Sequence, residues 1–395
     1  MKKLFVLSVS LLMAWSAWGQ DKDTSGYQFS VVKELPVTSV KNQGNAGTCW
    51  SFSGVGFLES ELIRMGKGEH DLSEMYIVRR NYADKAQKYV RLHGSLNFAQ
   101  GGSFADVVET IDEYGVIPED LYKGLSYGED GHKHGELSEI LTGYVKAVEK
   151  NSNRRLSTAW FNGFNGVLDA YFGSVPTEFE YNGKKYTPQS YAKSLGLESG
   201  NYISLTSFTH HPFYAPFAIE IPDNWRWALS YNLPIDDLMR VFDAAIESGY
   251  SIAWASDVSE IGFTRNGIAL IPDEDAPENA GSDQAHWLGL SQNERMNQLR
   301  TKVDQGPLKE KTITQEMRQI SYDNYETTDD HGMQIYGIAK DQNGTKFYMV
   351  KNSWGEAGKY KGFWYASESF VKYKTMSIVI HKDALPKDIA KKLGF

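Results

Sequence analysis

The sequence has only one cysteine, Cys49, among its 395 residues. No disulfide can form within such a chain, so its stability must come from packing. Basic residues are also scarce, since 41 Lys and Arg stand against 50 Asp and Glu and the formal net charge is −9. That balance excludes the basic footprint of a nucleic-acid partner. No apolar run beyond the N-terminal segment approaches the roughly 20 residues that span a bilayer, so we expect no stable membrane anchor.

The N-terminus has the pattern of a targeting segment. Two lysines precede a mostly apolar stretch at residues 4–17, and Ala17-Trp18-Gly19 forms a small-x-small cleavage site. This pattern predicts a secretory signal peptide at residues 1–19, with the mature chain starting at Gln20, rather than a buried N-terminal helix. No cysteine follows the apolar stretch, which excludes a bacterial lipid anchor. We therefore expect an exported protein, either periplasmic or secreted.

The surroundings of the single thiol favour catalysis. Cys49 lies six positions after Gln43, behind a run of small residues and at the start of an amphipathic pattern. Far downstream lie His331 and Asn352, and cysteine, histidine and asparagine in this order are the parts of a thiol protease. A lone cysteine is more often a small buried apolar residue. In an exported chain, however, oxidation threatens a free thiol, and this risk favours a chemical role for it.

Each of these residue types has a task in such chemistry. A thiol attacks an amide carbonyl as the thiolate, so its pKa must fall below about 8.5. A helix N-terminus at Cys49 and an imidazolium at His331 would both lower it. Asn352 can fix the orientation of the histidine ring, and Trp354 can shield that contact from water. The Gln43 side chain and the Cys49 backbone N–H would serve as donors to the oxyanion.

Hydrophobic periodicity predicts helices in the first part of the chain and antiparallel strands near its end. One helix begins at Cys49 and stops at Gly66. A second, over residues 104–114, follows Gly101-Gly102 and has Ser103 as its N-cap. Further helices are predicted at 136–152, 153–173 and 234–249, and strands at 251–255, 333–339, 346–351, 362–365 and 375–381. The charged segment 271–312 is expected to form loops and solvated helices, and the segment 383–395 a short helix and a tail.

These motifs resemble those of the papain-like cysteine peptidases. The matching residues are Gln43-Gly44, the segment 47–52, Asp330-His331-Gly332 and Asn352-Ser353-Trp354-Gly355. The spacing of 282 residues between the thiol and the histidine is about double that of a simple papain-like domain. It is most similar to the bleomycin hydrolase and bacterial aminopeptidase C branch, as are residues 101–118 and 314–319. The resemblance covers about 27–125 and 234–385 well and 126–233 only loosely.

The resemblance implies an α+β fold with two lobes, one helical and one of antiparallel strands. Residues 20–395 would form one peptidase domain with large, mainly helical insertions at about 126–233 and 257–325 and a C-terminal tail at 383–395. Cys49 would be the nucleophile, His331 the general base and acid, Asn352 the orienting residue and Gln43 the oxyanion donor. Substrate would lie along Gly101, Gly102 and Trp354, because glycines let a second backbone approach closely.

The resemblance also implies that peptides are cleaved through a thioester acyl-enzyme without a metal or organic cofactor. Removal of N-terminal residues is the favoured mode, with the carboxylate of the C-terminal tail meeting the substrate α-amine. Relatives of this branch form hexamers, so a homo-oligomer is expected too. The alternatives are an exported papain-like endopeptidase and, with less support, a non-catalytic peptide-binding protein. An inhibitory prosegment would fit an endopeptidase, but residues 20–40 leave no room for one.

Other histidines and acids have simpler explanations. His132-Lys133-His134 and His210-His211 are the pairs that a metal site would use. A closed site needs three or four placed ligands, and neither pair has evident further ones, so we expect no metal. Asp330 is expected to be a loop carboxylate rather than a fourth member of the catalytic set.

Overall fold

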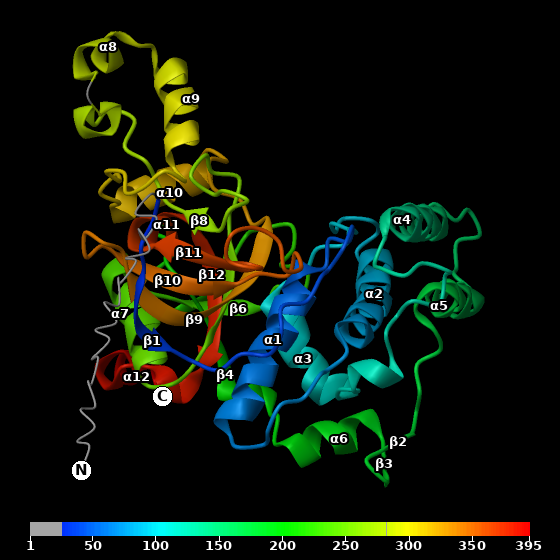
Figure 1. Ribbon diagram of the computed structural model, residues 1–395. Coiled ribbons are helices and arrows are strands. Elements are labelled where there is room, and N and C mark those ends of the chain that lie inside the picture. The colour runs from blue at the N-terminus through cyan, green and yellow to red at the C-terminus, as the bar shows by residue number, and fades with distance from the viewer. Residues whose placement is uncertain (1–25, 282) are drawn as a thin grey trace, which may run out of the picture.

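The computed structural model describes residues 26–281 and 283–395. The predicted signal peptide at residues 1–19 lies outside this part of the chain. A helical half and a β half lie side by side, with α1 between them (Figure 1). The helical half comprises α1 (Cys49–Arg64), α2 (Glu74–Arg91), α3 (Phe104–Tyr114), α4 (Gly135–Glu149), α5 (Ala159–Phe172) and α6 (Pro188–Leu195), together with the small hairpin of β2 (Phe179–Tyr181) and β3 (Lys184–Tyr186).

The β half is one large, mainly antiparallel sheet in the order β5-β6-β4-β12-β7-β9-β10-β11-β8, with β1 paired to β9. Its strands are β1 (Ser30–Glu34), β4 (Tyr202–Thr206), β5 (Pro216–Ala218), β6 (Leu229–Asn232), β7 (Ile252–Ser256), β8 (Ile268–Ala269), β9 (His331–Lys340), β10 (Lys346–Lys351), β11 (Phe363–Ser367) and β12 (Thr375–His381). Helices α7 (Ile235–Glu247), α10 (Gln315–Asp323), α11 (Glu368–Lys374) and α12 (Lys387–Leu393) accompany the sheet, and α8 (Gln284–Gly289) and α9 (Gln292–Lys302) project away from it (Figure 1).

Helix α1 joins the two halves because both of its faces are buried. Leu58 and Leu62 lie in the core of the helical half. On the other face, the Ser53 hydroxyl donates a hydrogen bond of 2.6 Å to the Gly332 carbonyl at the start of β9. The first residue of α1, Cys49, is thereby fixed next to the first residues of β9.

The β9–β10 hairpin brings two further residues to the same place. Its turn is closed by the Asp341 carboxylate, which accepts hydrogen bonds from the backbone N–H groups of Asn343 and Thr345 at 2.9 and 2.8 Å. His331 is the first residue of β9, and Asn352 directly follows β10. Antiparallel pairing therefore places His331 and Asn352 at the same end of the hairpin.

Several predicted elements are confirmed in position and type. Helices begin at Cys49 and Phe104, and Asp106 accepts the Ser103 backbone N–H at 2.7 Å, so Ser103 is the N-cap of α3. The helices predicted at 136–152 and 234–249 correspond to α4 and α7, and the predicted hairpin to β9 and β10. The helix predicted from residue 153 starts later, at Ala159.

The segment 126–233 is less helical than expected. Besides α4–α6 it contains β2–β6, and three of these strands extend the large sheet beyond β12. Strand β4 has the sequence YISLT and pairs with both β12 and β6, so its burial comes from partners distant in the chain. Such a short apolar run has no periodicity that identifies it as a strand.

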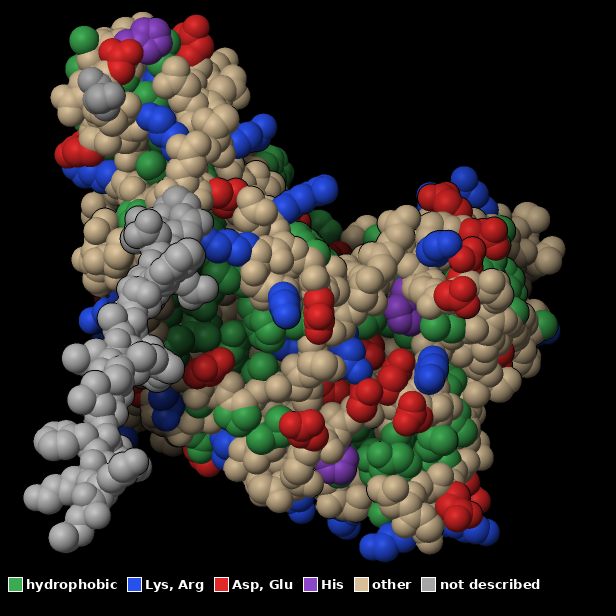
Figure 2. Space-filling view, in the orientation of Figure 1, with side chains coloured by type: hydrophobic (Ala, Val, Ile, Leu, Met, Phe, Trp, Pro, Cys, Tyr) green, Lys and Arg blue, Asp and Glu red, His purple; other side chains and the backbone are tan. Residues whose placement is uncertain are grey.

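Charges of both signs are mixed on the face of the molecule that Figure 2 shows. Acidic and basic side chains are interspersed over the visible face, including the arm formed by α8 and α9 (Figure 2). Within the described residues, no helix is both long and apolar enough to span a membrane.

Candidate active site

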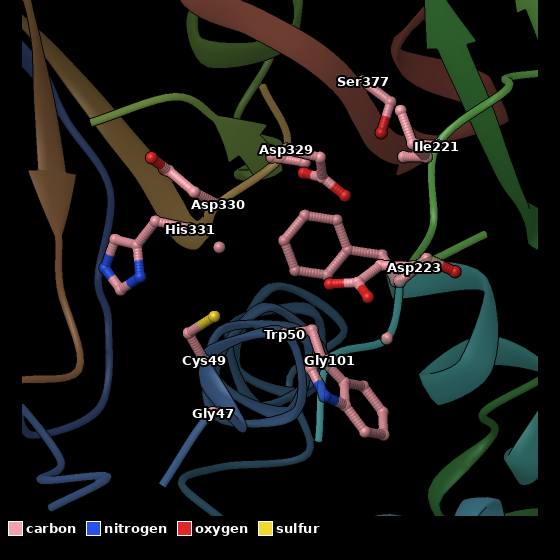
Figure 3. Close-up of a pocket in the computed structure, with 15 residues that line it drawn as sticks. Gly47, Cys49, Trp50, Gly101, Ile221, Asp223, Asp329, Asp330, His331 and Ser377 are labelled. Atoms are coloured by element: carbon pink, nitrogen blue, oxygen red, sulfur yellow. The ribbon is translucent and has the colours of Figure 1, made fainter. Parts of the chain in front are cut away.

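A cavity of about 250 Å³ opens where the two halves meet. Cys49 and Trp50 from α1 form part of its wall, and His331 and Gly332 from β9 form another part. Gly101 and the residues that follow it contribute a third wall. Figure 3 shows the Cys49 sulfur and the His331 ring lying beside each other at one side of this cavity.

The His331 ring is held by a short chain of hydrogen bonds. Its Nε2–H donates to Asn352 Oδ1 at 2.7 Å, and the Ser353 backbone N–H donates to the same oxygen at 2.7 Å. The second contact fixes which end of the Asn352 amide faces the histidine. Because Nε2 carries the proton, Nδ1 remains unprotonated and can accept one from Cys49. Both His331 and Asn352 are buried.

Trp354 covers this pair. Its ring lies over that of His331, with centroids 4.6 Å apart at an angle of 33°. This ring contact shields the histidine as expected. Trp354 does not line the cavity, so its contact with substrate stays a prediction.

Burial keeps the two reacting groups neutral. Cys49 is half-buried, and the packing around its sulfur raises the pKa of the thiol to about 12; the nearby Asp329 and Asp223 carboxylates add to this rise. Backbone N–H groups of Gly332 and Trp50 oppose it. Burial likewise lowers the pKa of His331 to about 4, against the opposing effect of its bond to Asn352. Both shifts oppose the ion pair anticipated from the sequence.

Gln43 lies next to these residues and is fixed at both ends of its amide. Its Nε2 donates to the Ala46 carbonyl at 2.7 Å, and its Oε1 accepts from the Ser353 hydroxyl at 2.6 Å. The amide nitrogen carries a second N–H, which leaves a donor for an oxyanion. Cys49 opens α1, where backbone N–H groups have no intrahelical acceptor. The oxyanion role of Gln43 remains a prediction that this geometry permits.

Gly101 and Gly102 form a wall in which an added side chain would displace or crowd its neighbours. A Cβ at Gly102 would lie 2.8 Å from the Trp50 ring, and a Cβ at Gly101 would overlap the Asp223 carboxylate. Both glycines line the cavity. Their expected pairing with the backbone of a peptide is a prediction that fits this position.

Two acidic residues, Asp223 and Asp329, were not singled out from the sequence and also line the cavity. Their carboxylates reach into it from the side away from His331 (Figure 3). Asp329 stands two residues before His331, so its closeness to the site was visible in the sequence. Asp223 lies between β5 and β6, inside the segment 126–233 that resembles the family only loosely, and no sequence motif pointed to it.

The segment that carries Asp223 is anchored to the helical half. The Trp225 indole donates to Asp106 of α3 at 3.0 Å, and the Arg226 guanidinium pairs with the same carboxylate at 2.8 Å and with Asp84 at 2.9 Å. Asp106 and Trp225 are buried. A connection between two strands of the β half is thus tied across the cleft, which positions Asp223 opposite the catalytic pair.

The carboxylates of Asp223 and Asp329 form an acidic wall of the cavity. Burial raises the pKa of Asp329 to about 8, and Asp223, Asp330 and Asp257 add to the rise. Burial also raises the pKa of Asp223, although Lys85 nearby opposes it. In the described part of the chain, no lysine or arginine lines the cavity. A group that brings a positive charge would therefore be stabilised here.

The C-terminal tail does not reach this cavity. Asp388 pairs with Arg240 of α7 at 2.9 Å, and the Phe395 ring packs on Tyr231 with centroids 5.3 Å apart. Figure 1 shows the C-terminus beside α12, remote from the start of α1. The expectation that the terminal carboxylate meets the substrate amine is wrong for this arrangement, because the buried Ile389 holds α12 against the core of the β half.

Comparison with known proteins adds three findings. Models described as papain family cysteine protease and Peptidase C1-like family match residues 26–169 and 282–394. Aminopeptidase C of Streptococcus thermophilus is 22% identical over 93% of this chain and 85% of its own length. Aminopeptidase G of Lactobacillus delbrueckii subsp. lactis is 22% identical over 90% and 83%. The crystal structure of PepW from Lactobacillus rhamnosis HN001 has a TM-score of 0.68 at 19% identity, covering 92% of this chain and 84% of that one.

Proposed function

The chain belongs to the papain family of cysteine peptidases, and we propose that it is an exported aminopeptidase that recognises the free α-amine of a peptide through Asp223 and Asp329. Its curated relatives are named aminopeptidases, which supports this mode over endopeptidase action. The observation that carries the proposal is the pair of carboxylates facing the cavity beside the nucleophile. Among residues 26–281 and 283–395, the groups that shift the pKa of the Asp329 carboxylate all raise it.

An ammonium group suits this place for an electrostatic reason. It would lie between two carboxylates whose pKa values are raised by burial, and its positive charge would favour their ionised forms. Hydrogen bonds from an ammonium to carboxylates are charge-assisted and stronger than neutral ones. An N-acetylated peptide or an internal segment of a chain offers no such charge. The acidic wall therefore favours peptide N-termini.

Catalysis would then use the neutral pair. As Cys49 Sγ attacks the scissile carbonyl carbon, its proton moves to Nδ1 of His331, and Asn352 keeps the ring in place. The negative charge on the carbonyl oxygen is met by the Gln43 amide and the Cys49 backbone N–H. His331 returns the proton to the departing amine, which leaves a thioester on Cys49. Water, deprotonated by His331, attacks the thioester carbonyl, and the acid product departs as the thiol regains its proton.

The acidic wall predicts a strong preference for free N-termini. A hydrogen bond to a charged group contributes about 1.5–3 kcal/mol, which corresponds to about 10- to 100-fold in kcat/KM. The test compares one peptide with a free and an acetylated N-terminus, using the Cys49→Ala chain as the inactive control. Equal rates for the two peptides, or cleavage at internal bonds, would refute the aminopeptidase proposal in favour of an endopeptidase.

Export and assembly belong to the same proposal. Cleavage after Gly19 predicts a mature chain that starts at Gln20, which cell fractionation and N-terminal sequencing of the purified protein would test. A homo-oligomer, such as the hexamer that the family resemblance implies, should have a mass several times the 44.5 kDa of the full-length chain when measured by light scattering. A monomer in solution would refute the assembly without affecting the chemistry.

A further inference from the structure

A second cluster of chemically active side chains lies outside the catalytic cavity. His210 and His211 follow β4, and Glu220 follows β5, so the sheet brings the three together. The Nε2 atoms of His210 and His211 lie 3.1 and 3.0 Å from the two oxygens of Glu220. One ligand atom from each of the three residues lies within 4.8 Å of the others.

These separations suit a small divalent ion. Zinc binds imidazole nitrogen and carboxylate oxygen at about 2.0–2.2 Å, and in a tetrahedral site this places neighbouring ligand atoms about 3.3–3.5 Å apart. The observed nitrogen–oxygen distances of 3.0 and 3.1 Å therefore need only small side-chain adjustments. Imidazole ligands favour zinc over calcium and magnesium, which take oxygen ligands.

The His210 ring is held in place by Gln319 behind it. Its Nδ1 lies 3.3 Å from Gln319 Oε1 and 3.1 Å from Gln319 Nε2. That oxygen also accepts the Thr209 backbone N–H at 2.6 Å, while Gln319 Nε2 donates to Asp323 at 2.9 Å. The orientation of the amide is therefore fixed, so Nδ1 either donates to Oε1 or accepts from Nε2. In the first tautomer the lone pair of Nε2 points to Glu220, as metal-ligating histidines require; the second tautomer belongs to the metal-free cluster.

Ring packing restricts both histidines. His210 stacks on Tyr322 at an angle of 16°, and His211 stacks on Phe217 with centroids 4.2 Å apart at 22°. The Tyr322 hydroxyl also donates to the Glu220 carbonyl at 2.9 Å. Side chains that are already ordered lose little conformational entropy when they bind an ion.

Solvent can still reach the cluster. The side chains of His210, His211 and Glu220 are 29%, 36% and 59% exposed. This exposure gives an ion a path of entry and leaves space for water as a fourth ligand, which a three-ligand zinc site keeps.

We propose that His210, His211 and Glu220 bind one zinc ion on the surface of the β half. The histidine pair was visible in the sequence, but Glu220 follows it at a distance that matches no common ligand spacing. Glu220 is also one residue before Ile221, which with Asp223 lines the catalytic cavity. The ion would thus hold one end of the connection between β5 and β6, while Arg226 holds the other end on α3.

The competing explanation is a metal-free cluster in which the histidines donate hydrogen bonds to Glu220. Titration of the full mature chain with Zn²⁺ at pH 7.5, followed by calorimetry, separates the two. Cys49→Ser should be present throughout, since the thiol and His331 would compete for zinc. This background also makes the result independent of the proposed peptidase activity.

We expect one Zn²⁺ per chain in this titration, with affinity at least tenfold weaker in His211→Ala and in Glu220→Gln. His70→Ala, which removes a surface histidine outside the cluster, should bind as the parent does. Co²⁺ should give visible absorption bands of tetrahedral intensity, and Zn²⁺ should slow amide hydrogen exchange in residues 208–224. Absence of saturable binding, or full affinity in both cluster variants, would overturn the proposal.

Discussion

Replacing Asp329 by asparagine tests most directly whether the acidic wall of Asp223 and Asp329 binds the substrate amine. The substitution keeps the shape of the side chain and removes its charge, and Figure 3 shows this carboxylate directed into the cavity. Loss of one charge-assisted hydrogen bond, about 1.5–3 kcal/mol, should lower kcat/KM for a free-amine peptide about 10- to 100-fold. The N-acetylated form of the same peptide should be affected much less, because it makes no such contact.

The pH dependence gives a second readout. With a pKa of about 8, Asp329 is protonated in the empty cavity below pH 8, and a bound ammonium must displace that proton. Catalytic efficiency should therefore rise between pH 6.5 and 8, by at most about tenfold per pH unit. It should fall above pH 8, because a peptide α-amine loses its own proton at about 7.7–8.0. Cys49 and His331 add no change in this range, since their pKa values lie near 12 and 4.

The assay is initial-rate hydrolysis of the paired peptides from pH 6 to 9. Asp329→Asn should lose the rise toward pH 8 as well as the preference for the free amine. Asp330→Asn is the comparison variant for the free-amine preference alone, because that carboxylate accepts the Val258 backbone N–H at 2.9 Å and is directed away from Asp329 (Figure 3). Its pH profile should differ from that of the parent, since Asp330 lines the cavity and adds to the raised pKa of Asp329. Retention of both the preference and the pH profile in Asp329→Asn would refute the recognition model, even if the enzyme proves to be an aminopeptidase.

Four further predictions follow from the site. Gly101→Ala should displace the Asp223 carboxylate, which its Cβ would overlap, and so reduce the ratio of free to acetylated peptide rates by about tenfold. Asn352→Ala should lower kcat about 10- to 100-fold with little change in KM, because the bond of 2.7 Å that orients His331 is lost; a normal kcat would contradict this role. Removal of Gly394 and Phe395 should leave the free-amine preference unchanged, since the tail packs on Tyr231; a lost preference would restore the tail model. Alkylation of Cys49 by iodoacetamide should accelerate about tenfold per pH unit between pH 7 and 9, because a raised thiol pKa makes the thiolate scarce; a rate independent of pH would instead indicate a preformed ion pair.

The structural positions of the predicted catalytic residues could be anticipated from the sequence because each residue lies in a local motif. Cys49 opens a helix, and His331 and Asn352 end the two strands of a hairpin whose turn is strongly marked. Local patterns of this kind place residues on helices and strands, and the pairing of β9 with β10 brings His331 and Asn352 together. The α+β papain-like fold expected from these motifs is confirmed.

The charge state of the catalytic pair was not predictable in the same way. A helix N-terminus and a neighbouring histidine both lower a thiol pKa, and the sequence shows both. It does not show how closely other segments pack around the sulfur, nor that the Asp329 and Asp223 carboxylates face the same cavity. Those two effects reverse the expected direction, because they depend on segments that meet only in the folded chain.

The C-terminal tail was expected to bind the substrate amine, whereas the acidic side chains of the cleft come from other segments. Sequence reasoning took amine recognition from the family resemblance and gave it to the last residues, whereas α12 is fixed on the β half by Arg240 and a buried Ile389. The cleft receives its charge instead from Asp329, just before β9, and from Asp223 on the connection between β5 and β6, in the least recognisable segment. That connection is held by Arg226 on Asp106 and carries Asp223 to the nucleophile. An insertion that adds strands at the edge of the sheet can therefore supply selectivity while the catalytic core stays unchanged, and selectivity should respond to changes at Arg226 that leave Cys49 and His331 in place.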